Sequence, residues 1–281
     1  MTGTLRYGTS SWSEKSWVGP FYPEGTATGD FLTEYARHFD TVEADNTYYR
    51  VPSAKMVDGW ADKTPDGFLL AAKFPRSVVH AGDGPRPDAG KVLEPEHCGE
   101  DTARFLEVMG RLGDKCGPLV LQFPYFNKSA FAEPGPFLDR LDAFLTELPA
   151  GFRYGVEIRN KNWVGEPLLE ILRRHSTALV LVDLLYMPHP KELADRFDLV
   201  TTDFVYGRLI GDRKAVDDKT DTFDRIVVDQ SKRLDGWAEL LETLMDRVPS
   251  GFVYANNHYA GHGPATIRDL MERYTARRSG S

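Results

Sequence analysis

Eight short apolar runs, each followed by a segment with helical spacing of apolar residues, limit the folds that this chain can adopt. The runs at 119–121 and 179–182 are continuously apolar, which is typical of parallel strands buried on both faces. The expected strands span 5–10, 41–46, 68–74, 117–123, 154–159, 178–185, 204–210 and 252–256. The expected helices span 30–39, 52–63, 101–112, 135–148, 167–175, 190–197, 226–248 and 264–274. Eight strand–helix pairs favour an α/β fold, a single (β/α)8 TIM-type barrel with parallel strands and long strand-to-helix loops.

The length of the chain allows one barrel or two smaller domains, since 281 residues with 41% hydrophobic content can bury a large core. No change in composition marks a boundary, so we expect a single TIM-barrel domain over residues 1–281. A doubly wound sheet would more often carry a glycine-rich phosphate turn after its first strand, and residues 8–11 lack that pattern. The segment 75–99, rich in Pro, Gly and charge, is expected to be a long functional or mobile connection.

The overall charge is acidic, with a formal net charge of −8 and a pI near 5.4. This balance disfavours a protein that coats nucleic acid, because phosphate binding needs a basic surface or stripe. Cys98 and Cys116 are too few for a disulfide framework, which indicates a reducing compartment. No run approaches the roughly 18 apolar residues of a membrane span, and the first residues show no apolar leader. We therefore expect a cytoplasmic protein with no membrane partner.

A polar or charged side chain stands at the carboxyl end of every expected strand. The strands carry, in order, Ser10 with Trp12, Glu43 with Asp45 and Asn46, Lys73, Gln122, Glu157 with Arg159, Asp183, Arg208, and Asn256 with Asn257. In a barrel the carboxyl ends of the strands meet at one mouth, where this fold builds its active sites. These residues are therefore expected to form one cluster.

Structural interpretations of the same residues stay open. Arg159 could form an ion pair with Glu157, and Asn256 with Asn257 could serve turn chemistry. The aromatic residues that follow the first two strands could pack as a lid. Lys73 follows the apolar run 69–72 and needs a partner, either a carboxylate or an anionic ligand.

Several motifs together give a specific resemblance. They are Gly8-Thr-Ser-Ser-Trp12, Trp17-Val-Gly-Pro-Phe-Tyr-Pro23, Val42-Glu43 with Thr47-Tyr-Tyr49, Lys73-Phe-Pro75, Leu121-Gln-Phe-Pro124, Val156-Glu-Ile-Arg159 with Trp163, and Asn256-Asn-His-Tyr-Ala-Gly-His262. From about residue 7 to 274 the chain resembles the YecE-like family, the domain of unknown function 72. The resemblance implies a TIM barrel whose activity is not established, and the family's label of sugar isomerase relative is an analogy of fold.

The sequence departs from the family pattern at four positions. Ser11 stands where Gly is usual and Glu14 where an aromatic residue is usual. Asn160 and Ile210 stand where many members have His, so the family pattern supplies no histidine base at these two positions.

The first functional hypothesis is a cofactor-independent enzyme that acts on a small polar, sugar-like or anionic substrate, as an isomerase, lyase or hydrolase. Carboxylates beside cationic groups can supply a base, an acid and an anion clamp without a metal. The expected catalytic residues are Glu43, Lys73, Glu157, Arg159 and Asp183. The expected substrate-binding residues are Trp12, Asp45, Asn46, Tyr49, Gln122, Arg208, Asn256 and Asn257. Glu43 or Glu157 would act as the base.

A metal-dependent hydrolase or isomerase is the second hypothesis. Its ligands would be Glu43, Glu157 and Asp183 with a histidine, either His80 or His258. The Lys and Arg residues expected at the same strand ends count against it, because they compete with a metal for the carboxylates.

A non-catalytic binding protein is the third hypothesis, either for a small ligand or for single-stranded nucleic acid. The aromatic residues Trp12, Trp17, Tyr22 and Tyr48 would form a stacking platform beside basic side chains. The acidic pI makes a nucleic-acid partner the minority view. The sequence leaves the substrate, the reaction and the oligomeric state open.

Overall fold

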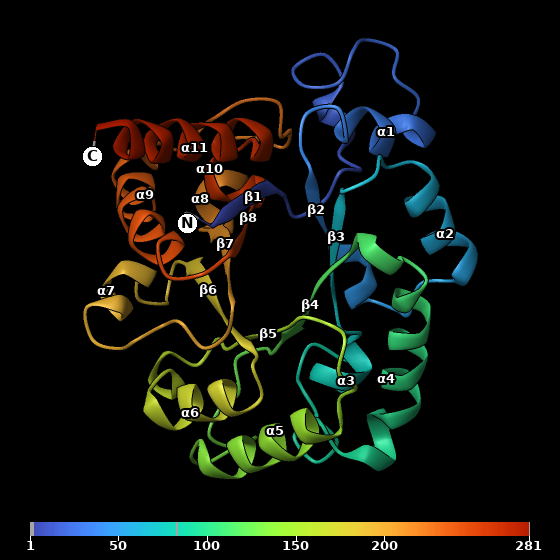
Figure 1. Ribbon diagram of the computed structural model, residues 1–281, viewed down its shortest axis with the longest axis vertical. Helices are drawn as coiled ribbons and strands as arrows, with labels where there is room; N and C mark the ends of the chain where they lie inside the picture. Colours follow the sequence, from blue (N-terminus) through green and yellow to red (C-terminus); the bar gives the residue numbers. More distant parts are fainter. Residues whose placement is uncertain (1–2, 83, 281) are drawn as a thin grey trace. The chain divides into compact units, whose positions relative to one another are not determined.

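The computed structural model describes residues 3–82 and 84–280, and its strands form an eight-stranded sheet in the order β1-β8-β7-β6-β5-β4-β3-β2 (Figure 1). The strands are β1 (Thr4–Thr9), β2 (Thr41–Ala44), β3 (Leu69–Lys73), β4 (Cys116–Gln122), β5 (Tyr154–Glu157), β6 (Ala178–Leu184), β7 (Phe204–Gly211) and β8 (Ser250–Ala255). Pairs such as β1 with β8 and β4 with β5 are parallel. The predicted (β/α)8 barrel is confirmed, and each predicted strand lies within one or two residues of an observed one.

The helices are α1 (Phe31–Tyr35), α2 (Ala54–Asp62), α3 (Arg76–Val79), α4 (Pro95–Gly110), α5 (Gly135–Glu147), α6 (Glu166–Arg174), α7 (Pro190–Ala194), α8 (Arg213–Asp217), α9 (Ser231–Met245), α10 (Asn257–Ala260) and α11 (Gly263–Gly280). Several predicted helix boundaries were wrong, since α1 ends at Tyr35 and not at 39, α4 starts at Pro95 and not at 101, α9 starts at Ser231 and not at 226, and α11 ends at Gly280 and not at 274. The segment 75–99 is not one long connection, because it holds α3 and the first turn of α4, which starts at Pro95. Proline suits a first helical turn, where its missing N–H would have no partner in any case.

The described residues divide into two compact units, which we treat separately. The first unit joins the residues up to 43 with those from 181 onward, and the second runs from 44 to 180. Within the first unit, α9 and α11 lie side by side (Figure 1) and are joined by Arg273 with Asp235 at 2.5 Å and Arg278 with Asp246 at 2.6 Å.

The inner face of the first unit is aromatic and polar. Arg208 of β7 is in register with Tyr254 of β8, and Tyr206 lies two residues before Arg208 on the same face. The Tyr254 hydroxyl is 2.6 Å from the Thr41 hydroxyl of β2. Interior layers of such barrels are usually filled by branched aliphatic side chains, so this face differs from the usual core.

The second unit shows the same alternation between two faces. Lys73 is in register with Val120, and Gln122 with Glu157, so Lys73, Gln122 and Glu157 share one face. The residues that follow Lys73 and Gln122 point the other way. Phe74 packs against Phe105 of α4 at a ring distance of 4.8 Å, and Phe123 packs against Phe137 of α5 at 4.9 Å. Helix packing thereby fixes three polar side chains on the inner face.

Candidate functional site

Within residues 44–180, the inner face carries a buried carboxylate and cations at the ends of neighbouring strands. Glu157 is 0% exposed, and its Oε1 accepts a hydrogen bond from Arg159 Nε at 2.9 Å. The Arg159 side chain keeps 25% of its surface accessible. Lys73 and Gln122 are 7% and 9% exposed. This group, which we call the Glu157 cluster, therefore combines a desolvated anion with a guanidinium that solvent can reach.

The turn after β2 is tied to the end of β3. The Thr47 hydroxyl accepts from the Lys73 backbone N–H at 2.9 Å and donates to the Lys73 carbonyl at 2.8 Å. Thr47 belongs to the 3-10 turn Asp45–Tyr48. Asp45 and Asn46, two residues of the predicted binding set, precede Thr47 in this turn. The Asp45 side chain is half-buried, whereas the Asn46 side chain is exposed.

Tyr48 is the last residue of this turn, and Tyr49 follows it. Burial raises the pKa of Tyr48, and the charges of Arg76 and Arg159 oppose that rise. The sensitivity of Tyr48 to Arg159 indicates that its phenol lies near the Glu157 cluster. Tyr49 is 77% exposed, which leaves its ring available for contact with a ligand.

Asn160, which follows β5, holds a loop in place. Its Oδ1 accepts from the Phe126 N–H at 2.9 Å, and its Nδ2 donates to the Phe126 carbonyl at 2.7 Å. The Phe126 ring stacks on Trp163 at 5.8 Å. An amide serves both backbone groups at once, which an imidazole cannot do in the same geometry.

In the first unit, Glu43 of β2 forms a buried ion pair with Arg208 of β7. Glu43 Oε1 accepts from Arg208 at 2.8 Å, and Oε2 accepts from the Tyr206 hydroxyl at 2.7 Å. Glu43 and Arg208 are 0% and 1% exposed. Burial raises the pKa of Tyr206 far above its usual value, and the charge of Glu43 adds to this effect. Tyr206 therefore stays protonated and donates.

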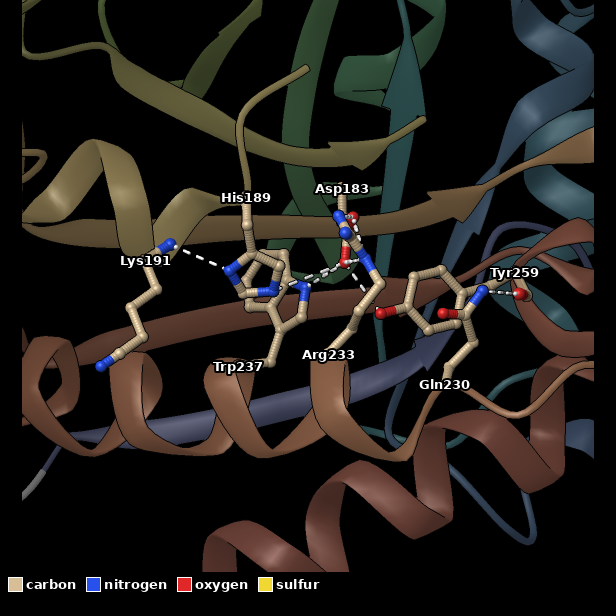
Figure 2. Close-up of polar contacts among 7 residues, drawn as sticks. All are labelled: Asp183, His189, Lys191, Gln230, Arg233, Trp237 and Tyr259. Atoms are coloured by element: carbon tan, nitrogen blue, oxygen red, sulfur yellow. Dashed lines mark hydrogen bonds and ion pairs between the residues drawn. The ribbon is translucent and has the colours of Figure 1, made fainter. Parts of the chain in front are cut away.

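Asp183, near the end of β6, points toward α9 and not along the inner face (Figure 2). Its carboxylate is 1% exposed and accepts from Arg233 Nε at 3.0 Å, from the Trp237 indole at 2.9 Å and from the Tyr259 hydroxyl at 2.8 Å. Arg233 donates through a second nitrogen as well. Burial, followed by the charge of Asp183, raises the pKa of Tyr259 well above its usual range. Asp183 thus anchors α9 and α10 to β6.

His189 stands at the edge of this arrangement, with Nε2 at 3.6 Å from Asp183 Oδ2 (Figure 2). Its Nδ1 accepts from the Lys191 N–H at 3.2 Å at the start of α7. Burial lowers the pKa of His189, against the opposing charge of Asp183. Because Nδ1 accepts the hydrogen bond from Lys191, the ring carries its proton on Nε2, which faces the carboxylate.

The remaining predicted binding residues serve local structure. Asn256 Oδ1 caps α10 by accepting from the His258 N–H at 2.9 Å, and Asn257 Oδ1 accepts from the Gly263 N–H at 2.8 Å. The Trp12 carbonyl accepts from the Tyr22 hydroxyl at 2.7 Å. The two asparagines show the turn chemistry that the sequence left open.

Potential metal ligands are dispersed. Over residues 3–82 and 84–280, no three His, Cys, Asp or Glu side chains form a group that could hold a metal ion. His80 Nδ1 accepts from the Gly82 N–H at 3.2 Å, while His258 Nε2 lies 3.2 Å from Asp217. Both histidines of the metal hypothesis are thus engaged elsewhere. In the same described residues, no helix combines the length and the apolarity that a membrane crossing requires.

Five residues of these arrangements were not predicted from the sequence. They are Tyr206, His189, Arg233, Trp237 and Tyr259. Tyr206 could have been found, because it lies two residues before Arg208 in one strand and so shares its face. Arg233 and Trp237 lie on α9, Tyr259 on α10 and His189 just before α7, and no local pattern links these residues to Asp183.

Comparison with known proteins identifies relatives. The YecE protein of Escherichia coli K12 is 34% identical over 154 residues, which are 54% of this chain and 47% of the relative. The chain thus matches about half of the length of that relative. A solved family protein of Thermotoga maritima has 25% identity and a TM-score of 0.71, covering 98% of this chain and 99% of that one.

More distant solved structures share the fold alone. D-psicose 3-epimerase of Clostridium cellulolyticum H10 has 9% identity and a TM-score of 0.50, with 98% of each chain covered. The model of the family described as "Protein of unknown function DUF72" matches residues 6–280. This match spans both units and nearly all of the sequence, and the chain belongs to the DUF72 family.

Proposed function

We propose that this protein is a cofactor-independent enzyme that removes a proton from the carbon beside the carbonyl group of a small sugar-like substrate, with Glu157 as the base. The observation that supports this proposal is the Glu157 cluster: a carboxylate without solvent exposure, held 2.9 Å from a guanidinium that stays partly accessible. Charged groups at strand ends cost stability and are typically kept for a ligand.

The chemistry assigns a role to each member of the cluster. Glu157 takes the proton, the C–H bond breaks, and its electron pair moves to the carbonyl oxygen to form an enediolate. Arg159 and Lys73 stabilise the negative charge that develops on that oxygen. Electrostatic stabilisation of this kind lowers the activation barrier strongly in a site with little water. The Gln122 amide orients a substrate hydroxyl. Return of the proton to the former carbonyl carbon, with the proton of the neighbouring hydroxyl passing to the former carbonyl oxygen, completes an isomerisation. A proton delivered by water to the original carbon from the opposite face, with Glu157 keeping the proton it took until solvent removes it, completes an epimerisation.

The fold relationship indicates which substrates to test first. One of the solved structures is named D-psicose 3-epimerase, and another is described as a D-tagatose 3-epimerase-like protein. At 9% and 14% identity these structures show the fold alone. The proposal of a hydroxy ketone as substrate therefore rests on the Glu157 cluster, and the epimerases only suggest which sugars to test first.

Deuterium exchange tests the proposal directly. The protein is incubated in D2O with D-fructose, D-tagatose and their 6-phosphates, and the proton NMR signals of the carbons beside the carbonyl are followed. The expected result is enzyme-dependent loss of one such signal, absent in Glu157→Gln. Glu100→Gln, on α4, is the matched control and should exchange as the unaltered protein does. Equal exchange by Glu157→Gln, or no exchange with any sugar of the panel, would contradict the proposal.

A further inference from the structure

The second unit also carries a pocket between the loops that follow β4 and β5. Its lining residues lie in two short stretches, 125–134 and 160–163, and its volume is about 340 Å³. Small-molecule sites have volumes of roughly 300–1,000 Å³. Both loops leave the carboxyl ends of their strands, which is the end where barrels of this kind build their binding sites. We call this space the loop pocket.

The wall of the loop pocket is held in place before any ligand enters. The Asn160 amide makes two hydrogen bonds to the Phe126 backbone, at 2.9 and 2.7 Å, and so joins the two loops. Trp163 stacks on Phe126 with 14° between the ring planes, and Phe131 meets Trp163 edge to face. A preformed wall lowers the entropic cost of binding, because little has to be ordered when the ligand arrives.

Aromatic surface of the loop pocket reaches solvent. Tyr125 is 58% exposed, and Trp163 is half-buried. Both residues line the pocket. An aromatic ring offers a flat apolar face, and tyrosine adds a polar edge. The C–H face of a sugar ring is also apolar, so the two faces can pack together.

Polar side chains of both signs surround the same pocket. Lys128, Glu133, Lys161 and Asn162 line it and are exposed. Over residues 3–82 and 84–280, none of these four side chains forms a hydrogen bond or an ion pair with another residue. The lysines and the glutamate thus line one pocket without pairing, and their hydrogen-bonding groups are available to a ligand.

This set of groups suits sugar hydroxyls better than a phosphate or an apolar molecule. A hydroxyl both donates and accepts, so it can bind to an ammonium, a carboxylate or an amide. A phosphate could bind to the two lysines, but the Glu133 carboxylate in the same pocket would repel it. An apolar molecule would take charged groups out of water without offering them a partner.

From these observations we infer that the loop pocket binds one ring of an uncharged saccharide. The Tyr125 ring packs against the apolar face of the sugar, and Glu133, Lys161 and Asn162 form hydrogen bonds with its hydroxyls. The inference does not depend on proton transfer at Glu157, because a sugar without a ketone group satisfies the same contacts.

The test uses the full chain and three uncharged disaccharides built from aldoses: maltose, cellobiose and lactose. Saturation-transfer NMR detects binding, and tryptophan fluorescence gives the dissociation constant, because Trp163 lines the pocket. We expect saturable binding of at least one of the three. Tyr125→Ala should weaken it at least about fivefold. Tyr186→Ala, which removes an exposed tyrosine of the other unit, is the matched control and should leave it unchanged.

Two further variants locate the bound sugar. Glu133→Ala removes an acceptor and should weaken binding about two- to tenfold. Glu157→Gln should bind the disaccharide as the unaltered protein does, so a failure of the proposed proton transfer and a failure of this inference can be told apart. Circular dichroism checks the folding of each variant.

Three results would overturn the inference. The first is no binding of any of the three disaccharides, and the second is equal binding by Tyr125→Ala and the unaltered protein. The third is loss of binding in Glu157→Gln, which would place the sugar at the Glu157 cluster. Saturable binding of inorganic phosphate that Lys161→Met abolishes, without binding of any sugar, would instead identify an anion site.

Discussion

Glu43 and Arg208 form an ion pair of 2.8 Å in which neither side chain has more than 2% of its surface exposed. Replacing Arg208 by Met strands a buried carboxylate, and we expect the free energy of unfolding to fall by about 3–5 kcal/mol. Urea denaturation measures this change.

The matched control is Arg111→Met, which breaks an exposed pair with Asp58 and should change stability little. The double variant Glu43→Gln with Arg208→Met should recover part of the loss, because it removes the stranded charge. Full additivity of the two single changes would show that the pair is not coupled.

The Glu157 cluster should respond differently. Arg159 is 25% exposed, so water can partly solvate Glu157 when Arg159→Met removes the guanidinium. We expect a loss of stability of about 1 kcal/mol or less together with at least tenfold slower deuterium exchange. A loss of about 3–5 kcal/mol that Glu157→Gln restores, with exchange unaffected, would instead identify a structural ion pair.

Gly207 of β7 allows Trp237 to reach Asp183. A Cβ at Gly207 would lie 2.9 Å from Trp237 Cζ3, closer than the atoms can approach. Gly207→Ala should therefore destabilise the protein by about 1–3 kcal/mol and shift tryptophan fluorescence. Gly59→Ala of α2 is the control, since a Cβ at this position meets nothing within 4 Å. This substitution should raise the free energy of unfolding by about 0.5–1 kcal/mol. Equal effects of the two changes would refute this packing argument.

His262 should make stability depend on pH. Burial, with help from the charge of Arg268, lowers the pKa of His262 to about 4. In the unfolded chain the imidazole binds a proton near pH 6.5, so acidification favours the unfolded state between these two values. We expect the His262 contribution to cost about 2 kcal/mol between pH 7 and pH 5.

Urea denaturation at the two pH values measures this dependence. His262→Asn keeps an acceptor for the Ala265 N–H and should flatten the pH dependence, whereas His97→Asn at an exposed position should not. If the free energy of unfolding falls equally between pH 7 and pH 5 in the unaltered protein and in His262→Asn, then His262 is not the group that titrates.

The barrel and much of the Glu157 cluster follow from the local pattern of the sequence. The alternation of apolar runs with helical segments predicted the parallel strands, because strands buried on both faces need continuous apolar side chains. Lys73, Gln122 and Glu157 were predicted at strand ends. The residues that follow the first two, Phe74 and Phe123, pack outward against helices. Side chains alternate between the two faces of a strand with a period of two residues, so the face of each residue can be predicted from its position in the strand.

The partners of the polar side chains depended on the tertiary structure. Asp183 was predicted with the other strand-end residues, yet its donors Arg233 and Trp237 lie 50 and 54 residues away on α9. Asn160 bonds to Phe126, 34 residues earlier in the chain. Hydrogen bonds act over about 3 Å, so which groups meet is decided only when packing brings distant segments together. The sequence alone therefore placed the charges at strand ends, and the packing of helices against the strands decided which of them became anchors and which stayed within reach of solvent.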